Sequence, residues 1–249
     1  MTYANFYREP LLLDADRHRH LKIAVLTDYS VASKLHAVYV SSSEFAQAAL
    51  DFPIVFIKSG APDQNGRHPV SPVVLLGLSD GENLCVEGSR WDARYIPATV
   101  RRYPFLMTRL DGSDTPALLI DSAWSGLSET EGEPLFEADG RAAFALTSAL
   151  QFLETFDAEA RQTQAFCASL VQLDILEEMS AGATLPGGET LSVDGFFTVN
   201  EEKLRALPDE SVLGLHRSGM LTLLNVHLLS LNNMRHLVDR KLRRLAAPA

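Results

Sequence analysis

The sequence has few cysteines and few basic residues, and each shortage excludes a class of protein. Its 249 residues include two cysteines, Cys85 and Cys167, and neither has a Cys-x-x-Cys or Cys–His partner nearby. We therefore exclude zinc fingers and thioredoxin-like motifs, and we expect both thiols to be buried as small hydrophobic groups. The chain carries 22 Lys and Arg against 32 Asp and Glu, a net charge of -10. We expect no binding of nucleic acid, because that function usually requires a basic surface.

Long hydrophobic runs are also missing. The longest nearly unbroken apolar stretches span 72–78 and 220–231, whereas a membrane-spanning helix needs roughly 20 apolar residues. The first residues do not show the basic and then apolar regions of a secretory signal. We therefore expect no membrane span and a cytoplasmic location.

The common catalytic signatures are absent as well. The sequence contains no Gly-x-Ser-x-Gly elbow, no Walker A loop, no His-Glu-x-x-His motif and no EF-hand loop. A Gly-x-Gly-x-x-Gly fingerprint after a strand is not found either. We therefore expect no metal site and no cofactor, and no catalytic residue is assigned by a motif.

What the sequence does contain is a change of pattern near residue 135. Short apolar runs alternate with turn residues before it, and helical patterns dominate after it. This predicts an α+β fold with a mixed or mainly antiparallel sheet, packed helices and a helix-rich C-terminal half. We expect a single domain over 1–249. Its parts are a β-rich part at about 1–125, an acidic loop at about 111–140, and a helical part with a β-hairpin at about 141–249.

Local patterns predict two hairpins and two long helices. Gly-Gly turn residues at 187–188 predict a hairpin across 183–199. A turn at 79–83 predicts a second hairpin, between the strands on either side of it. The helical patterns run over 141–178, with a break near Ala158, and over 220–245, after a helix that ends at Gly219.

Charge is unevenly distributed along the chain. Residues 111–140 contain eight acidic residues and no Lys or Arg, whereas 235–249 contain five Lys or Arg and one Asp. Opposite charges of this kind attract, so we expect the two segments to meet. A contact within the fold and a contact across a homo-oligomer both remain open.

A segment dense in arginine and aromatic residues is the first candidate ligand-binding region. Its candidate residues are Trp91, Arg94, Arg101, Arg102 and Tyr103. Because a guanidinium binds a carboxylate through two hydrogen bonds and stacks on rings, the segment suits an anionic or aromatic ligand. The alternative is that these arginines form structural ion pairs with the acidic loop.

The C-terminal helical pattern holds the second set of candidates. His227 lies on an otherwise apolar helix, and His216 lies about three helical turns before it. A histidine in a pocket can act as an acid or base near neutral pH, but a buried histidine with a hydrogen-bond partner is the simpler interpretation. Asn232 and Asn233 follow on the same helix, where they either line a polar cleft with His227 or bond to nearby backbone.

Several segments, taken in order, resemble the SapC family of bacterial proteins, which are about this long. The segments are AALDFPIVF at 48–56, LLGLSDGENL at 75–84, WDARYIP at 91–97, RRYPF at 101–105, GEPLF at 132–136, LSVDGF at 191–196 and HLLSLNN at 227–233. Together they extend over nearly the whole chain.

The resemblance implies a setting more than a mechanism. The family takes its name from a link to bacterial surface-layer (S-layer) proteins, and genes of similar proteins often lie near tryptophan-halogenase-like enzymes and TonB-dependent receptors. A peptide-transporter permease of the same name is excluded here by the lack of membrane spans. The family has no established catalytic residues to carry over to this chain. We therefore expect a non-catalytic accessory or binding protein of a surface-layer or uptake system, with a small-molecule or protein partner.

The alternative is an enzyme of unrecognised type. It would act near the halogenase-like systems on a small carboxylate or aromatic substrate. In that case His227 or His216 would be the acid or base, and Arg101, Arg102 or Arg94 would bind the carboxylate.

Overall fold

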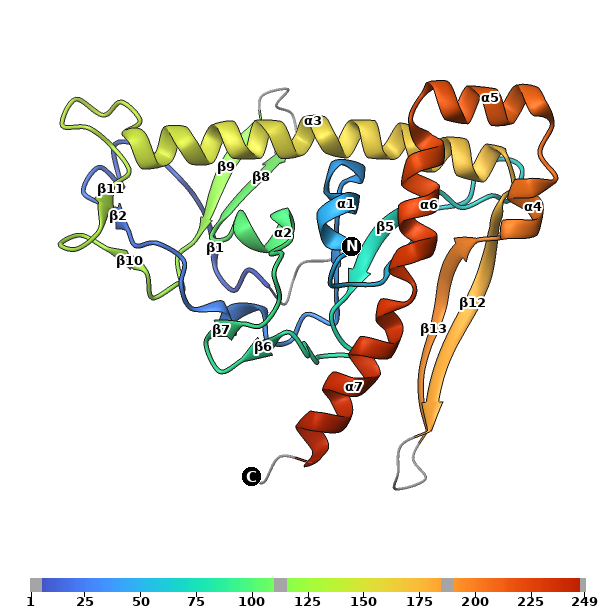
Figure 1. The fold of residues 1–249 in the computed structure, drawn as a ribbon. Coiled ribbons are helices and arrows are strands. Elements are labelled where there is room, and N and C mark those ends of the chain that lie inside the picture. Colours follow the sequence, from blue (N-terminus) through green and yellow to red (C-terminus); the bar gives the residue numbers. More distant parts are fainter. Residues whose placement is uncertain (1–5, 110–115, 185–189, 247–249) are drawn as a thin grey trace.

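A computed structural model describes residues 6–109, 116–184 and 190–246 (Figure 1). Its largest sheet has five strands in the order β12-β13-β4-β5-β3, and all neighbouring strands are antiparallel. The strands are β3 (Ala37–Tyr39), β4 (Ile54–Lys58), β5 (Val70–Leu75), β12 (Leu176–Thr184) and β13 (Thr190–Val199). The sheet therefore joins strands from both halves of the chain.

Three small antiparallel sheets accompany the large one. They are β1 (Pro10–Leu12), β9 (Pro116–Asp121) and β8 (Phe105–Arg109); β10 (Leu127–Ser128), β2 (Lys22–Ile23) and β11 (Glu133–Pro134); and β6 (Val86–Glu87) with β7 (Arg90–Trp91). With the helices listed next, this confirms the predicted α+β class and the helix-rich C-terminal half. The prediction of one domain stays a prediction.

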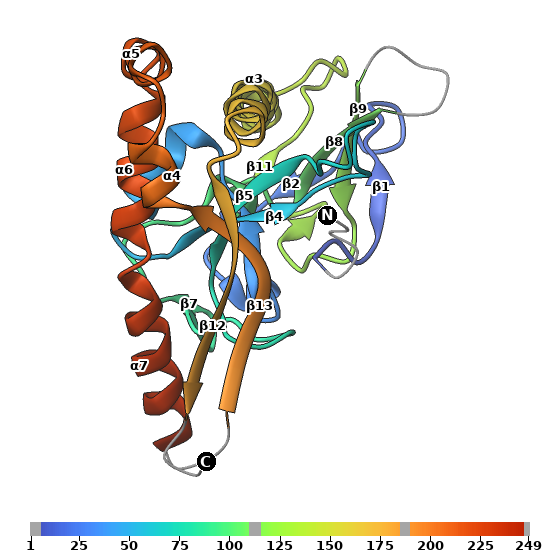
Figure 2. The same ribbon diagram turned by 90° about the vertical axis from the view of Figure 1, so that its right-hand side faces the viewer.

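The helices cover the sheets on two sides. They are the 3-10 turns η2 (Tyr29–Ala32) and η3 (Ser42–Glu44), and the α-helices α1 (Phe45–Ala48), α2 (Ala98–Arg101), α3 (Phe144–Gln172), α4 (Glu201–Arg205), α5 (Asp209–Arg217), α6 (Met220–Ser230) and α7 (Asn233–Ala246). Figure 2 shows α3 nearly end-on above the sheets, with α6 and α7 forming a column along one side. Within the described ranges, no helix has both the length and the apolar character that crossing a membrane requires.

The long helix α3 contacts β5 of the large sheet and β8 and β11 of the smaller ones. Its 29 residues are continuous, so the predicted break near Ala158 is wrong. No Gly or Pro interrupts the helix, and buried residues such as Leu153, Phe156 and Leu170 hold it to the sheets along most of its length. The helix ends where Asp174 adopts a φ of 53°, and strand β12 begins two residues later. The predicted extension to residue 178 is therefore wrong as well.

Two other local expectations also change. The turn at 79–83 brings the N–H of Leu84 back to the carbonyl of Leu76, at 2.7 Å, but Val86 and Glu87 pair with Trp91 and Arg90 rather than with the strand before the turn. The predicted helix over 220–245 is divided into α6 and α7 at Leu231. The predicted hairpin is present, although its Gly-Gly turn lies outside the described residues.

The segment expected to be an exposed acidic loop is partly built into sheets. Strand β9 lies between β1 and β8, and its last residue, Asp121, is fully buried. The carboxylate accepts hydrogen bonds from the backbone N–H groups of Arg8 and Glu9 and from the Tyr103 hydroxyl. Burial alone would raise the pKa of Asp121, but these hydrogen bonds outweigh it and lower the pKa. This acid therefore anchors the N-terminal strand.

The basic end of α7 binds a different acidic partner from the one expected. Arg240 forms an ion pair of 2.7 Å with Asp92, and Lys241 forms one of 2.6 Å with Glu82. Arg244 donates hydrogen bonds to two backbone carbonyls of the 83–86 segment. Among the described residues, α7 forms no ion pair with the segment 116–140. The helix is thus fixed to the 82–92 segment.

The ion pair of Lys241 with Glu82 is better shielded from solvent than the pair of Arg240 with Asp92. It predicts that substitution of Lys241 destabilises the protein more than substitution of Arg243 on the same helix. The side chains of Lys241 and Glu82 are 17% and 15% exposed. Replacing Lys241 by Met leaves a shielded carboxylate without its cation, so we expect a loss of about 2 kcal/mol in the free energy of unfolding. The matched change Arg243→Met, at an exposed position, is expected to cost less than about 0.5 kcal/mol. Urea unfolding of both variants measures this, and equal losses would contradict it.

Candidate functional site

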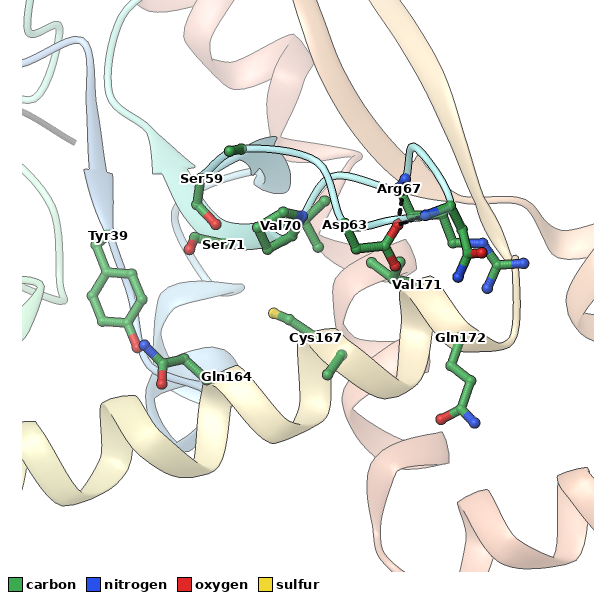
Figure 3. A pocket seen from close by; sticks show the side chains of 14 residues that line it. Tyr39, Ser59, Asp63, Arg67, Val70, Ser71, Gln164, Cys167, Val171 and Gln172 are labelled. Carbon is green, nitrogen blue, oxygen red and sulfur yellow. Dashed lines mark hydrogen bonds between the residues drawn. The ribbon is translucent and has the colours of Figure 1, made fainter.

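A large cavity lies between α3 and the loop that joins β4 to β5 (Figure 3). This groove has a volume of about 990 Å³. The loop and the strands contribute Tyr39, Ser59, Ala61, Asp63, Asn65, Arg67, Pro69, Val70 and Ser71, and α3 contributes Gln164, Cys167, Ala168, Val171 and Gln172. We call it the α3 groove.

The loop side of the α3 groove is held in shape by its own hydrogen bonds. Asp63 accepts hydrogen bonds from the backbone N–H groups of Asn65, at 2.8 Å, and Arg67, at 2.9 Å. The bond from Arg67, followed by the one from Asn65, lowers the pKa of Asp63. Gly66 takes a φ of +76°, which allows the tight reversal between them. The loop backbone therefore faces α3 in a defined conformation.

The helix side of the α3 groove is one face of α3. Gln164, Cys167, Ala168, Val171 and Gln172 recur at intervals of three or four residues, so they lie on the same face of the helix. Cys167 is 2% exposed, and burial raises the pKa of its thiol to about 12. Because the thiolate is the reactive form, this cysteine is inert at neutral pH.

The described residues that line the α3 groove are suited to binding. They offer hydroxyl and amide groups, one carboxylate already bonded to backbone, and one guanidinium, but no histidine and no lysine. Neither the loop nor this face of α3 carries a motif that predicts a binding site. The one sequence feature that indicates a polar face on this part of the helix is the spacing of Gln164 and Gln172, which are two helical turns apart.

The structure separates the sequence-predicted ligand-binding residues into groups. Arg101, Arg102 and Tyr103 line a second cavity of about 290 Å³. Trp91 is 8% exposed, and its indole N–H donates to the carbonyl of Tyr95, at 2.8 Å. That bond fixes the tryptophan in the core.

Arg94 forms a structural ion pair, as the alternative expected, but with another acid. Its Nε lies 2.9 Å from Asp51, and its guanidinium also donates to the carbonyl of Leu50. Asp51 in turn accepts from the backbone of Arg94 and Tyr95. Arg94 therefore joins the end of α1 to the segment before α2.

The two asparagines have different environments. Asn233 is buried and donates to the backbone carbonyls of Ala49 and Phe52, at 2.7 and 3.2 Å. Asn232 is exposed and donates to the carbonyl of Leu229. Both thus bond to nearby backbone, which is one of the two interpretations that the sequence left open.

His227 is fully buried between α6 and the large sheet. Its Nδ1 donates to the carbonyl of Ile54 at 2.9 Å, and its Nε2 accepts from the N–H of Val199 at 3.1 Å. This pair of bonds requires the neutral imidazole with its proton on Nδ1. Burial lowers the pKa of His227 to about 4. His216 is exposed on α5.

The imidazole of His227 occupies a place in the sheet itself. Strands β13 and β4 are paired at one position, Phe197 with Phe56. In an antiparallel ladder the next hydrogen-bonded pair would be Val199 with Ile54, which are the two residues that the imidazole joins. His227 therefore replaces a backbone contact where the two strands diverge.

This arrangement predicts a pH-dependent stability. The folded pKa of about 4 is below the unfolded value of 6.5, so the unfolded chain binds the extra proton. The stabilisation is fully present above pH 6.5 and is lost as the pH falls toward 4, by up to roughly 3 kcal/mol.

The test compares unfolding in urea across this pH range for the wild type, His227→Gln and the exposed control His216→Gln. We expect His227→Gln to be less stable at pH 7, because glutamine does not reproduce the two imidazole hydrogen bonds, by about 2 kcal/mol. The difference from the wild type should shrink as the pH falls, while His216→Gln should follow the wild type. A difference for His227→Gln that does not change with pH would contradict the interpretation.

Groups of metal ligands and similarity to known proteins also bear on the function of this chain. Across the described residues, no three His, Cys, Asp or Glu side chains are grouped so that they could hold a metal ion. No curated protein and no solved structure matches the chain. The family model described as SapC matches residues 13–237, which include both cavities and His227. The chain therefore belongs to the SapC family.

Proposed function

We propose that this chain is a non-catalytic binding protein, and that the α3 groove receives an extended polypeptide segment of a partner protein. The proposal rests on the volume and the lining of the α3 groove. Its volume of about 990 Å³ is at the upper end of the range of about 300–1,000 Å³ for small-molecule pockets. This volume has room for a short polypeptide segment.

The lining of the α3 groove matches the chemistry of a polypeptide backbone. Each residue of an extended chain presents one N–H donor and one carbonyl acceptor. The amides of Gln164 and Gln172 can both donate and accept, and so can the hydroxyls of Ser59 and Ser71. The two glutamines are two helical turns apart, about 12 Å, which corresponds to roughly four extended residues.

One charge in the α3 groove favours an acidic residue in that segment. The Arg67 guanidinium forms no ion pair with any described residue. Asp63, the acid of the same loop, is engaged by backbone N–H groups. A carboxylate in the partner segment would therefore find an available guanidinium.

The alternative of an enzyme receives less support. His227 has both ring nitrogens bonded to backbone, and His216 lies on α5, outside both the α3 groove and the second cavity. We place the binding protein in a bacterial surface-layer or uptake system, and this setting rests on the family link alone.

Selection from a displayed random-peptide library tests the proposal. We expect the wild-type protein to enrich peptides that contain an acidic residue. Ala168→Trp fills the α3 groove, and we expect it to weaken the selected peptides by at least about tenfold, because a bulky side chain excludes the ligand. Arg67→Gln should weaken them by about two- to fivefold, as an exposed charge pair does.

Ala158→Trp is the matched control, because Ala158 is exposed on the same helix and does not line the α3 groove. It should bind the selected peptides like the wild type. Enrichment of no peptide, or equal binding by Ala168→Trp, would contradict the proposal.

A further inference from the structure

A second, smaller cavity lies beside the first half of α3 and is separate from the α3 groove. It has a volume of about 290 Å³. Its walls are Ile23, Ala24, Leu26, Arg101, Arg102, Tyr103, Pro104, Phe105, Trp124, Ser148, Ala149, Phe152 and Leu153. None of these residues lines the α3 groove.

Arginine supplies the charge of this cavity. The described residues of its lining include Arg101 and Arg102 and no acidic residue. Arg101 donates to the carbonyl of Ile96 at 2.9 Å and to the Tyr95 hydroxyl at 3.3 Å. These bonds use two of its five N–H donors, and Arg101 forms no ion pair with the described residues. Donors therefore remain for an anion at the mouth of the cavity.

The rest of the cavity is apolar and aromatic. Trp124 is 7% exposed and lies edge-on to Tyr103, with ring centroids 5.9 Å apart. Phe152 of α3 also contributes to the lining, and the Arg101 guanidinium lies 5.2 Å from the centroid of its ring. Flat rings and leucine side chains cover an apolar body well, whereas they leave the hydroxyls of a sugar or a phosphate ester without partners.

We propose that this cavity binds a small carboxylic acid with a flat apolar body. Arg101 holds the carboxylate, and Trp124, Phe152 and Leu153 cover the ring. Arg102 is buried and lies 4.7 Å from the centroid of the Phe156 ring. The volume limits the ligand to one or two rings. The site is independent of the α3 groove.

Calorimetric titration with three probes tests the proposed chemistry. The probes are phenylacetate, which has both features, acetate, which lacks the ring, and 2-phenylethanol, which lacks the charge. We expect phenylacetate to bind at least about tenfold more tightly than either of the others, because a charge-assisted contact and the ring burial are both needed. If acetate bound as tightly as phenylacetate, the site would be a nonspecific anion contact. If 2-phenylethanol bound as tightly as phenylacetate, Arg101 would not contribute to binding. Either result would contradict the proposal.

Variants locate the binding. Arg101→Gln should weaken phenylacetate by about tenfold, and Ser148→Trp, at an exposed position of α3 on the cavity wall, should abolish binding. Arg161→Gln is the matched control, because Arg161 is exposed on α3, which forms part of the cavity wall, but lies outside the lining. Ala168→Trp in the α3 groove should also bind phenylacetate normally, so that the two proposals fail separately. Absence of phenylacetate binding to the wild type, or full binding by Ser148→Trp, would overturn the inference.

Discussion

The contact on which the structure depends most is the pair of hydrogen bonds made by His227. Strand β13 comes from the C-terminal half of the chain and β4 from the N-terminal half, and they are paired at one position. Beyond it, the imidazole joins the N–H of Val199 to the carbonyl of Ile54, while Ser230 accepts from the N–H of Ile54. Both backbone groups of Ile54 are thus satisfied by α6. If these partners were absent, each of the two buried backbone groups would be unsatisfied, and each would lower the stability of the fold by about 1–3 kcal/mol.

The α3 groove depends on strand β4, which this contact positions. Strand β4 leads directly into the loop that forms one wall of the α3 groove, and α3 forms the other wall. Helix α6 continues into α7, which is held to α1 by Asn233 and to the 82–92 segment by Arg240 and Lys241. The helical column in Figure 2 thus packs against β13 and β4 of the large sheet. His227 therefore has a structural role, because both of its ring nitrogens are bonded to backbone. The proposed binding sites lie elsewhere.

The sequence predicted those features that depend on short-range patterns. The α+β class, the buried cysteines and the hairpin across 183–199 all follow from local composition and spacing. The division of the last helix did not follow, because Asn233 is drawn into the fold by carbonyls some 180 residues away. For the same reason the α3 groove escaped notice, since its walls are distant in sequence and carry no motif. Arg101, Arg102 and Tyr103, which are adjacent in sequence, line one cavity, and their binding of a ligand stays a prediction.

Nitrogen-15 NMR of the His227 imidazole tests most directly the claim that this histidine is a neutral structural bridge. The structure requires a proton on Nδ1 and a free lone pair on Nε2. The account predicts that this tautomer persists as the pH falls below 6.5 and that the ring protonates near pH 4 or only on unfolding. A ring that titrates near 6.5 in the folded protein, or that carries its proton on Nε2, would contradict it.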